Sequence, residues 1–266
     1  MNNLHQGTAL ITGASSGIGA IYAERLARRG YDLVLVARNR ERLNALASRI
    51  TSETRRSVEV FPADLANPGD LAEVEHKLRD DASITLLVNN AGIGTHTHLL
   101  DSDVERMAEM ISLNVTALTR LTYAAVPGFV ARQRGAVINI SSVLSLTPEA
   151  LNGVYGASKA YVTAFTQSLH KELSAQGIRI QAVLPGATAT ELWEIGGLPL
   201  AHLDPGIVMT AGDLVDGALK DFDHGVLVSI PSLHDLAPYQ TYEASRQALA
   251  GLLSNSQLAP RYGTNP

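Results

Sequence analysis

The sequence of 266 residues contains no cysteine, and this absence excludes several kinds of chemistry at once. Without thiols the chain can form neither a disulfide nor a thiolate nucleophile, and it lacks the usual ligands of structural zinc. A chain without cysteine suits a reducing compartment, so we expect a cytoplasmic protein.

Long apolar segments are also missing. No apolar run approaches the ~20 residues that are needed to cross a bilayer. Residues 1–7 lack the basic and apolar regions of a signal peptide. We therefore expect a soluble, unprocessed protein with no membrane partner.

An excess of positive charge is absent as well. The chain has 21 Lys and Arg against 26 Asp and Glu, which gives a formal net charge of -5. This balance offers no electrostatic footprint for a nucleic acid, so we expect no nucleic-acid partner. Apolar residues make up 45% of the chain, which at this length is enough for one large α/β domain with a full core.

No internal repeat and no linker rich in Pro, Gly or Ser divides the chain. We therefore predict a single domain over residues 1–266, with a C-terminal helical extension near residues 235–266. Turn residues and few regular signals mark residues 186–210. Long irregular segments of compact domains often cover binding sites, so residues 186–210, called the lid below, are predicted to close over a substrate.

Short runs of β-branched residues and Leu alternate along the chain with longer segments of helix-forming residues. The expected strands are Thr8–Thr12, Leu33–Ala37, Val58–Phe61, Ile84–Val88, Ala136–Ile140, Ile178–Leu184 and Val226–Ile230. The expected helices include Ile18–Arg29, Arg40–Thr51, Pro68–Asp81 and Tyr155–Ala175. This alternation predicts an α/β fold with a Rossmann-like, doubly wound parallel sheet of about seven strands and helices on both faces.

A glycine-rich turn follows the first predicted strand and opens into the first predicted helix. The turn reads TGASSGIG over residues 12–19, with a GxxxGxG spacing instead of the commoner GxGxxG. Its backbone can approach a pyrophosphate, and the helix N-terminus supplies amide donors. No Lys followed by Ser or Thr closes the turn, which disfavours a P-loop; a turn without any ligand remains the alternative. The candidate cofactor-binding residues here are Gly13, Ser15, Ser16, Gly17, Ile18 and Gly19.

The residue after the second strand bears on which dinucleotide is used. An acidic residue at that place usually binds the adenosine ribose of NAD, but this chain has Arg38, and Asp32 lies at the opposite end of the strand. An Arg without an acidic neighbour suits the 2′-phosphate of NADP. The sequence therefore favours NADP(H), with NAD(H) still possible. Alternatively, Arg38 only begins the polar face of the next helix with Arg40 and Arg42.

Tyr155 and Lys159 are four residues apart on one face of a predicted helix. Tyr155 alone of the eight tyrosines has a Lys at this spacing. Lowering the pKa of a tyrosine from about 10 to about 7 requires roughly 4 kcal/mol of preferential stabilisation of the phenolate, which a nearby cation can help to supply. The pair can thus provide an acid for catalysis, although an ordinary surface pair remains the alternative.

With these motifs in order, the chain resembles the short-chain dehydrogenase/reductase family over about residues 6–230. The matching motifs are TGASSGIG, Asp64-Leu65, Asn89-Asn90-Ala91-Gly92, Asn114, Ser141-Ser142, Tyr155 with Lys159, and Pro185-Gly186 followed by Thr188 and Thr190. The resemblance implies that Asp64 and Leu65 contact the adenine, that Asn90 lies beside the adenosine, and that Thr190 holds the nicotinamide amide. Ala91, Gly92, Pro185, Gly186 and Thr188 complete the implied cofactor site. Taken alone, Asp64 reads as a turn residue before the next helix.

The resemblance also implies a catalytic set. The family's serine stands thirteen residues before its tyrosine, which selects Ser142 over Ser141. Tyr155 would then be the general acid for hydride transfer to a carbonyl, and Ser142 would hydrogen-bond the substrate oxygen. Lys159 would lower the pKa of Tyr155 and, with Tyr155, contact the cofactor at the nicotinamide ribose. Asn114 matches an asparagine that supports a water between Lys159 and solvent.

We therefore expect an NADP(H)-dependent oxidoreductase that acts on a carbonyl or secondary alcohol of small to medium size and hydrophobic character. One alternative is an acyl-carrier-type 3-oxoacyl reductase, for which Arg120, Arg132 and Arg134 could form a docking patch. A second is a non-catalytic NADP-binding sensor or scaffold. The family resemblance suggests a homo-oligomer, either a tetramer or a dimer.

Several weaker features complete the picture. His96 and His98 have no matched third ligand, so no metal is expected, and His96 is a candidate for lining the substrate site. Trp193 in the lid suggests an apolar cover for a hydrophobic substrate, with local core packing as the alternative. Tyr242 and Arg246 share the spacing of the catalytic pair but have no companion serine, so we interpret them as structural.

Overall fold

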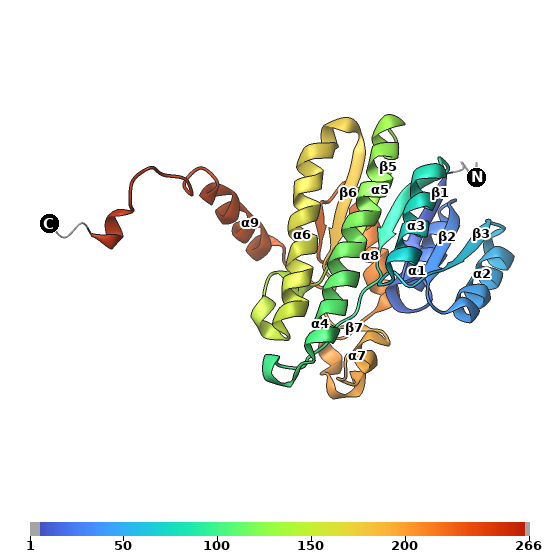
Figure 1. Ribbon diagram of the computed structural model, residues 1–266, viewed down its shortest axis with the longest axis horizontal. Coiled ribbons are helices and arrows are strands. Elements are labelled where there is room, and N and C mark those ends of the chain that lie inside the picture. The colour runs from blue at the N-terminus through green and yellow to red at the C-terminus, as the bar shows by residue number, and fades with distance from the viewer. Residues whose placement is uncertain (1–5, 264–266) are drawn as a thin grey trace. The chain divides into compact units, whose positions relative to one another are not determined.

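The computed structural model describes residues 6–263 of the chain (Figure 1). The chain divides into two compact units, Met1–Ser232 and Leu233–Pro266. The first unit contains the sheet and the candidate site, and the second contains one longer helix.

Parallel strands form the central sheet of the first unit, in the order β3-β2-β1-β4-β5-β6-β9. The strands are β1 (Thr8–Thr12), β2 (Asp32–Ala37), β3 (Val58–Pro62), β4 (Ile84–Asn89), β5 (Gly135–Ile140), β6 (Ile178–Val183) and β9 (Val228–Ser229). The predicted doubly wound, Rossmann-like sheet is confirmed. Chain order reverses between β1 and β4, and the loops that leave these two strands diverge at their carboxyl ends, where such folds bind ligands.

The predicted strands agree with the observed ones to within two residues at each end. The largest difference is β9, since the apolar run Val226–Ile230 contributes only two residues to the ladder. β9 lies at the edge of the sheet and pairs with β6 only through Val228 and Ser229. An edge strand has a single neighbour to fix its length, so its apolar run overstates its extent.

Helices cover both faces of the sheet, as predicted (Figure 1). One core packs β1 and β2 against α1 (Gly17–Arg28), α2 (Arg40–Thr54) and α8 (Ala211–Asp223). The other packs the opposite face against α3 (Pro68–Asp80), α5 (Leu118–Ala131) and α6 (Gly153–Leu173). Neighbouring residues of β1 point to opposite faces, with Ile11 in the first core and Leu10 in the second.

Asn152 fixes the start of α6, the helix that carries Tyr155 and Lys159. Its side-chain oxygen accepts hydrogen bonds from the backbone N–H groups of Val154 (2.9 Å) and Tyr155 (3.1 Å). This N-cap satisfies two donors that the helix itself leaves unpaired. The helix consequently begins at Gly153, two residues before its predicted start.

A π-helical segment, Ser112–Ala117, joins α4 (Val104–Ile111) to α5. The sequence predicts Asn114 within a helix, and the structure places it in these wider turns. Such segments within helices often occur at functional sites. The amide of Asn114 is thereby directed away from solvent, and only 2% of the residue is exposed.

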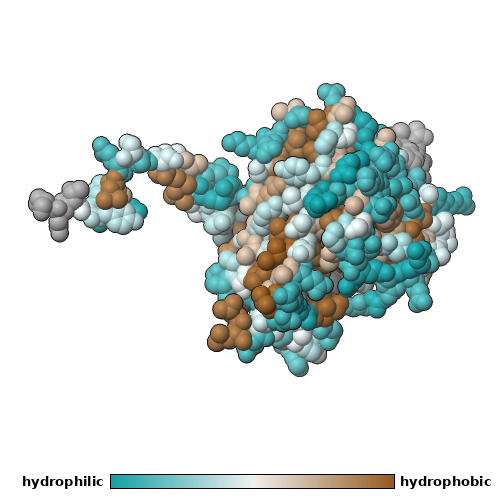
Figure 2. All heavy atoms as spheres, viewed as in Figure 1, coloured by the Kyte–Doolittle hydropathy of each residue, from teal (hydrophilic) through white to brown (hydrophobic). Residues whose placement is uncertain are grey.

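Exposed apolar side chains gather at the tip of the loop after β4 and at the start of α4 (Figure 2). Leu99, Leu100 and Val104 are 82%, 94% and 73% exposed. Apolar groups left this open often take part in contacts with other molecules.

The second unit contains α9 (Ala237–Leu249) and a short 3₁₀ turn at Pro260–Tyr262. No residue of α9 is buried. Tyr242 and Arg246 lie in α9, where Arg246 pairs with Glu243 at 2.6 Å. The prediction of one domain over residues 1–266 stays a prediction. Within residues 6–263, every helix is too short or too polar to cross a membrane.

Candidate active site

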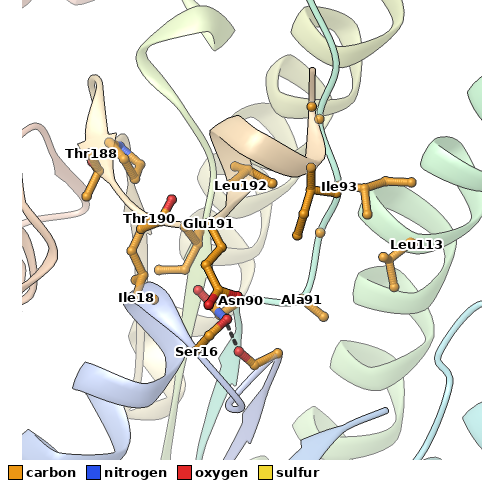
Figure 3. A pocket seen from close by; sticks show the side chains of 18 of the residues that line it. Ser16, Ile18, Asn90, Ala91, Ile93, Leu113, Thr188, Thr190, Glu191 and Leu192 are labelled. Atoms are coloured by element: carbon orange, nitrogen blue, oxygen red, sulfur yellow. Dashed lines mark hydrogen bonds between the residues drawn. The ribbon is translucent and has the colours of Figure 1, made fainter. Parts of the chain in front are cut away.

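A cavity of about 520 Å³ lies at the carboxyl ends of the strands, bounded by the loops that follow β1 to β6 and by the lid (Figure 3). Every predicted catalytic or cofactor-binding residue lines it except Gly19 and Asn114. Residues that are more than one hundred positions apart in the chain thus meet in one space. The geometry supports the interpretation that the separate motifs serve one site.

The glycine-rich turn forms the floor of the cavity. Its backbone packs closely against neighbouring segments, so its glycines have little space for side chains. Gly13 and Gly17 have positive φ angles of 63° and 54°, a conformation that favours glycine. A β-carbon on Gly13 would lie 2.8 Å from Asn90 Nδ2. A β-carbon on Gly19 would lie 2.3 Å from the carbonyl oxygen of Gly13. Gly19 therefore supports the turn from behind and does not line the cavity.

Asn90 and Thr12 hold this turn against the loop that follows β4. The Asn90 amide donates hydrogen bonds to the carbonyl oxygens of Thr12 (2.9 Å) and Gly13 (3.1 Å). In return, the Thr12 hydroxyl accepts from the backbone N–H groups of Asn90 and Ala91, both at 3.0 Å. Asn90 thus shapes the cradle in addition to lining it.

Asp64 combines the two roles that its sequence context allowed. Its carboxylate accepts a hydrogen bond from the backbone N–H of Ala66 at 3.0 Å, which is a turn contact. Asp64 and Leu65 also line the cavity. The turn therefore presents both residues to the ligand space.

Arg38 lines the cavity at the end of β2 and is exposed. The helix α2 begins only after its N-cap, Asn39, so Arg38 stands before the helix and outside its polar face. This position leaves the guanidinium free to face an anion in the cavity.

Two neighbouring serines follow β5, and the structure separates their roles. The Ser141 hydroxyl donates to the carbonyl oxygen of Lys159 (2.7 Å) and lies 2.8 Å from the Thr163 hydroxyl. The Ser142 hydroxyl accepts a hydrogen bond from the backbone N–H of Leu144 at 3.1 Å, and it interacts with Tyr155 across the cavity wall. Since Ser141 is engaged by α6, the geometry favours Ser142 as the serine that meets a substrate.

The electrostatics of Tyr155 differ from the expectation. Burial raises the pKa of the Tyr155 phenol, and the hydrogen bond with Ser142 lowers it only in part. Burial also lowers the pKa of Lys159 to about 8. The expected lowering of the Tyr155 pKa by Lys159 is therefore wrong for this structure, because desolvation of both groups dominates.

Lys159 is held beside Tyr155 without touching its hydroxyl. Its ammonium group donates to the carbonyl oxygen of Ile140 at 3.1 Å and lies 5.8 Å from the centre of the Tyr155 ring. Next to it, Gly92 packs closely on both side chains, since a β-carbon there would lie 3.0 Å from Asn114 Oδ1 and 3.6 Å from Lys159 Nζ.

Asn114 acts from behind the cavity wall. Its amide nitrogen donates to the carbonyl oxygen of Ile93 (2.9 Å) and to the Ser158 hydroxyl (3.1 Å), and its oxygen accepts from the Ile93 N–H (3.0 Å). Asn114 therefore ties the loop after β4 to α6. Its support of a water beside Lys159 stays a prediction.

The lid contains the short strands β7 (Thr188–Ala189) and β8 (Met209–Thr210), which pair with each other, and the helix α7 (Leu192–Ile195). Trp193 lines the cavity and donates its indole N–H to the carbonyl oxygen of Thr188 at 2.8 Å. Ile195 and Leu198 line the cavity beside it. The lid thus presents an apolar surface to the cavity, as a substrate cover would.

His96 also lines the cavity, as predicted, and it fastens the lid. Its Nδ1 lies 2.8 Å from the carbonyl oxygen of Gly196, which can only accept, so Nδ1 carries the proton. Arg106 donates to the carbonyl oxygen of Ile195 at 2.9 Å. Among the described residues, no cluster of three or more His, Asp and Glu side chains could hold a metal ion. That the reaction needs no metal stays a prediction.

Several cavity residues were missed at the level of the sequence. Apolar side chains from the loops beside the catalytic motifs are Ile93, Leu113, Val143, Leu144 and Leu151. Their proximity to Asn90, Asn114, Ser142 and Tyr155 in the chain was an available signal. No such signal existed for Arg42 and Glu191, which meet at the cavity although 149 positions separate them.

Comparison with known proteins identifies the family. A family model described as short chain dehydrogenase matches residues 7–195. The chain belongs to this family. The resemblance noted in the sequence is thereby confirmed, and residues from most of the motifs that carry it line the cavity.

Two solved structures are similar over nearly the whole chain. One is a short-chain dehydrogenase from Sphingobium yanoikuyae in complex with NADPH, with 49% identity, a TM-score of 0.94, and coverage of 97% of this chain and 100% of that chain. The other is the bulky-bulky ketone specific alcohol dehydrogenase from Comamonas testosteroni, with 44% identity, a TM-score of 0.88, and coverage of 96% and 98%.

A curated relative, named for a substrate other than the bulky-bulky ketones, is the very-long-chain 3-oxoacyl-CoA reductase of Anas platyrhynchos. It is 34% identical over 191 residues, which cover 70% of this chain and 61% of the relative. The similarity therefore leaves more than a third of that reductase unmatched.

Proposed function

We propose that the protein is an NADP(H)-dependent oxidoreductase that transfers a hydride between the nicotinamide and a carbonyl or secondary alcohol. The observation that carries the proposal is the meeting of Ser142, Tyr155 and Lys159 at the wall of a cavity whose floor is the glycine-rich turn. This arrangement places a proton donor and a hydrogen-bond donor next to a dinucleotide cradle.

The residues present fit a dinucleotide. Gly13 and Gly17 lack the β-carbons that would fill the cradle, and α1 begins at Gly17, so amide donors and the positive end of the helix face the cavity. Arg38 supplies a cation where the 2′-phosphate of NADP(H) is expected. The NADPH complex of the similar Sphingobium enzyme supports this choice over NAD(H).

The bound cofactor supplies or accepts the hydride, and the residues of the chain manage the proton. Tyr155 Oη donates a proton to the substrate oxygen during carbonyl reduction, and the Ser142 hydroxyl hydrogen-bonds the same oxygen. The phenol of Tyr155, whose pKa burial raises in the cofactor-free protein, is protonated at neutral pH. Lys159 places a positive charge beside the phenolate that remains.

The expected substrate is a hydrophobic ketone, aldehyde or alcohol of small to medium size. The lid contributes Trp193, Ile195 and Leu198 to the cavity, and the opposite wall contributes Leu144 and Leu151. The similarity to an alcohol dehydrogenase that is specific for bulky-bulky ketones supports a ketone as the substrate and favours the upper end of this size range.

An alternative is the reduction of 3-oxoacyl thioesters, which the similarity to the very-long-chain reductase favours. The suggested docking patch does not strengthen it. Arg120 pairs with Glu75, while Arg132 and Arg134 donate to the carbonyl oxygens of Ile84 and Gln6. A non-catalytic sensor is a further alternative, which the complete set of Ser142, Tyr155 and Lys159 disfavours.

The test is the oxidation of NADPH, followed by its absorbance, against a panel of bulky ketones, aldehydes and 3-oxoacyl thioesters. We expect turnover of bulky ketones, with a higher kcat/KM for NADPH than for NADH. Tyr155→Phe should lower the rate of turnover by a factor of about 10² to 10⁴ and leave the affinity for NADPH unchanged. NADPH binding without turnover of any compound would favour the sensor instead.

We further propose that the protein is a cytoplasmic homo-oligomer. Family resemblance alone suggests a homotetramer or a homodimer, and the lack of cysteine alone suggests the cytoplasm. Light scattering of the purified protein would determine the former.

A further inference from the structure

An ion pair crosses the cavity at the place where the lid meets the adenosine end of the cofactor site. Arg42 Nη1 lies 2.6 Å from Glu191 Oε2. Arg42 belongs to the first turn of α2, and Glu191 belongs to the lid, directly after Thr190. Both residues line the cavity, so the pair joins its two sides.

Each partner is held near the cofactor site by a separate contact. The backbone N–H of Arg42 donates to the Asn39 side chain at 3.0 Å, which fixes Arg42 one turn beyond Arg38. On the other side, Thr190 packs on the glycine-rich turn, since a β-carbon on Gly17 would lie 3.2 Å from Thr190 Cγ2. Arg42 is therefore placed by the start of α2, and Glu191 follows a lid residue that packs on the glycine-rich turn.

The carboxylate of Glu191 is directed into the region where the cradle would bind an anion. Figure 3 shows the Glu191 side chain extending from the lid toward Ser16 and Asn90. Arg38, Arg42 and the start of α1 all favour negative charge in this region. A carboxylate that pairs with one of these cations resembles a phosphate in charge and in hydrogen-bonding geometry.

We propose that Arg42 is a second cation of the 2′-phosphate site, beside Arg38, and that Glu191 competes with this phosphate for it. Binding of the phosphate exchanges one partner of Arg42 for the other and releases the lid at Glu191. The two residues then set the preference for NADP(H), and Glu191 couples that choice to the lid. This inference rests on the proposed function, because it requires NADP(H) as the ligand.

Breaking the ion pair requires little free energy compared with what binding of the ligand provides. Its side chains are 49% and 53% exposed, and pairs this open contribute little to stability. Replacing Glu191 by an uncharged residue should therefore tighten NADPH binding by about two- to fivefold. Loss of Arg42 removes a charge-assisted contact to the phosphate and should weaken NADPH binding on the order of tenfold.

The experiment measures the Kd of NADPH and of NADH, by calorimetry, for the wild type and the variants Glu191→Gln, Arg42→Gln and their combination. We expect Glu191→Gln to lower the Kd of NADPH and Arg42→Gln to raise it, and we expect neither variant to change the Kd of NADH. In the double variant the effect of Glu191→Gln should vanish, since the competition requires Arg42. Arg40→Gln and Glu194→Gln are matched controls, because neither residue lines the cavity.

The release of the lid has its own readout, because the only Trp of the chain, Trp193, lies two residues after Glu191. Adenosine 2′,5′-bisphosphate contains the phosphate but no nicotinamide, and AMP lacks the 2′-phosphate. We expect the bisphosphate to change the fluorescence of Trp193 in the wild type but not in Glu191→Gln, and AMP to change it in neither.

The inference is overturned if Glu191→Gln leaves the NADPH to NADH affinity ratio unchanged, or if Arg42→Gln weakens both cofactors equally. Arg38→Gln distinguishes this failure from failure of the proposed function. If Arg38→Gln weakens NADPH binding while Arg42→Gln and Glu191→Gln have no effect on it, only the inference fails. If the wild type does not prefer NADPH at all, the proposed cofactor and the inference fail together.

Discussion

Ser141 donates its hydroxyl hydrogen to the carbonyl oxygen of Lys159 at 2.7 Å. This hydrogen bond attaches the end of β5 to the helix that carries Tyr155 and Lys159. Ser142, the next residue, is free to face the cavity. We therefore propose separate tasks for these two chemically identical side chains, folding for Ser141 and catalysis for Ser142.

Substitution of these two serines should separate stability from turnover. Ser141→Ala leaves the buried Thr163 hydroxyl and the Lys159 carbonyl with fewer partners, so we expect a loss of about 1–3 kcal/mol in the free energy of unfolding. Ser142→Ala should lower kcat by a factor of about 10² and change stability less. Denaturant unfolding and steady-state kinetics on both variants check this, and equal loss of kcat in both would contradict it.

Tyr155 should titrate above an ordinary tyrosine when no cofactor is bound, because burial raises its pKa. The difference in tyrosinate absorbance between the wild type and Tyr155→Phe, followed against pH, isolates this group. A titration below about 10 would contradict the prediction.

The rates should show the consequence of that pKa. Carbonyl reduction uses the protonated phenol, so its rate should stay level through neutral pH. Alcohol oxidation uses the phenolate, so its rate should rise by up to about tenfold per pH unit over the same range. Initial rates in both directions test this, and an oxidation rate that is independent of pH would argue against Tyr155 as the proton carrier.

Lys159 should make the stability of the cofactor-free protein increase with pH. Burial lowers its pKa from 10.5 to about 8, so between these values the unfolded chain binds more protons than the folded one. Stability then rises as the pH increases from about 8 to about 10, by at most roughly 3 kcal/mol. Above about 10 the raised pKa of Tyr155 acts in the opposite direction, since the unfolded chain loses its phenolic proton first.

Thermal unfolding of the wild type and of Lys159→Met, each measured without cofactor, would isolate this contribution. The rise in stability should be absent from the variant. If the stability of the wild type and of Lys159→Met depended on pH in the same way across this range, the ammonium group would be solvated and the prediction would be wrong.

Glycine substitutions should distinguish the cradle from an ordinary helix start. Gly19→Ala places a β-carbon 2.3 Å from the carbonyl oxygen of Gly13, so the turn must move; we expect NADPH affinity to fall at least tenfold. Gly153→Ala is the control, because nothing lies within 4 Å of its β-carbon. That change should keep affinity and raise stability by up to about 1 kcal/mol. Calorimetry and thermal unfolding measure the two effects.

Much of the fold followed from the sequence because the inner strands of the sheet are buried on both faces. Continuous apolar runs such as Leu33–Ala37 then predict strands of a parallel sheet. The polar motifs that follow these strands converge at the carboxyl edge of the sheet. What the sequence could not supply were contacts between distant segments. The pairing of Arg42 with Glu191 and the hydrogen bond of His96 to Gly196 each depend on how the lid folds back.

Local context and solvation set the other limit of prediction. The spacing of Tyr155 and Lys159 correctly placed both side chains in one site, but it carried no information about water. Only the packed structure shows that Lys159 is buried and that Tyr155 is partly buried, and this desolvation reverses the expected direction of the tyrosine pKa. Likewise, the π-helical turns around Asn114 have no signature in the residue types themselves.

His96 and Arg106 hold the lid through the main-chain oxygens of Gly196 and Ile195, which every amino acid possesses. The fastening therefore does not depend on which side chains the lid presents to the cavity. Residues such as Leu192 and Leu198 can be exchanged through mutation while the cover stays attached. An enzyme built in this way can acquire new substrates by small steps, because the change of specificity is separated from the closure of the site.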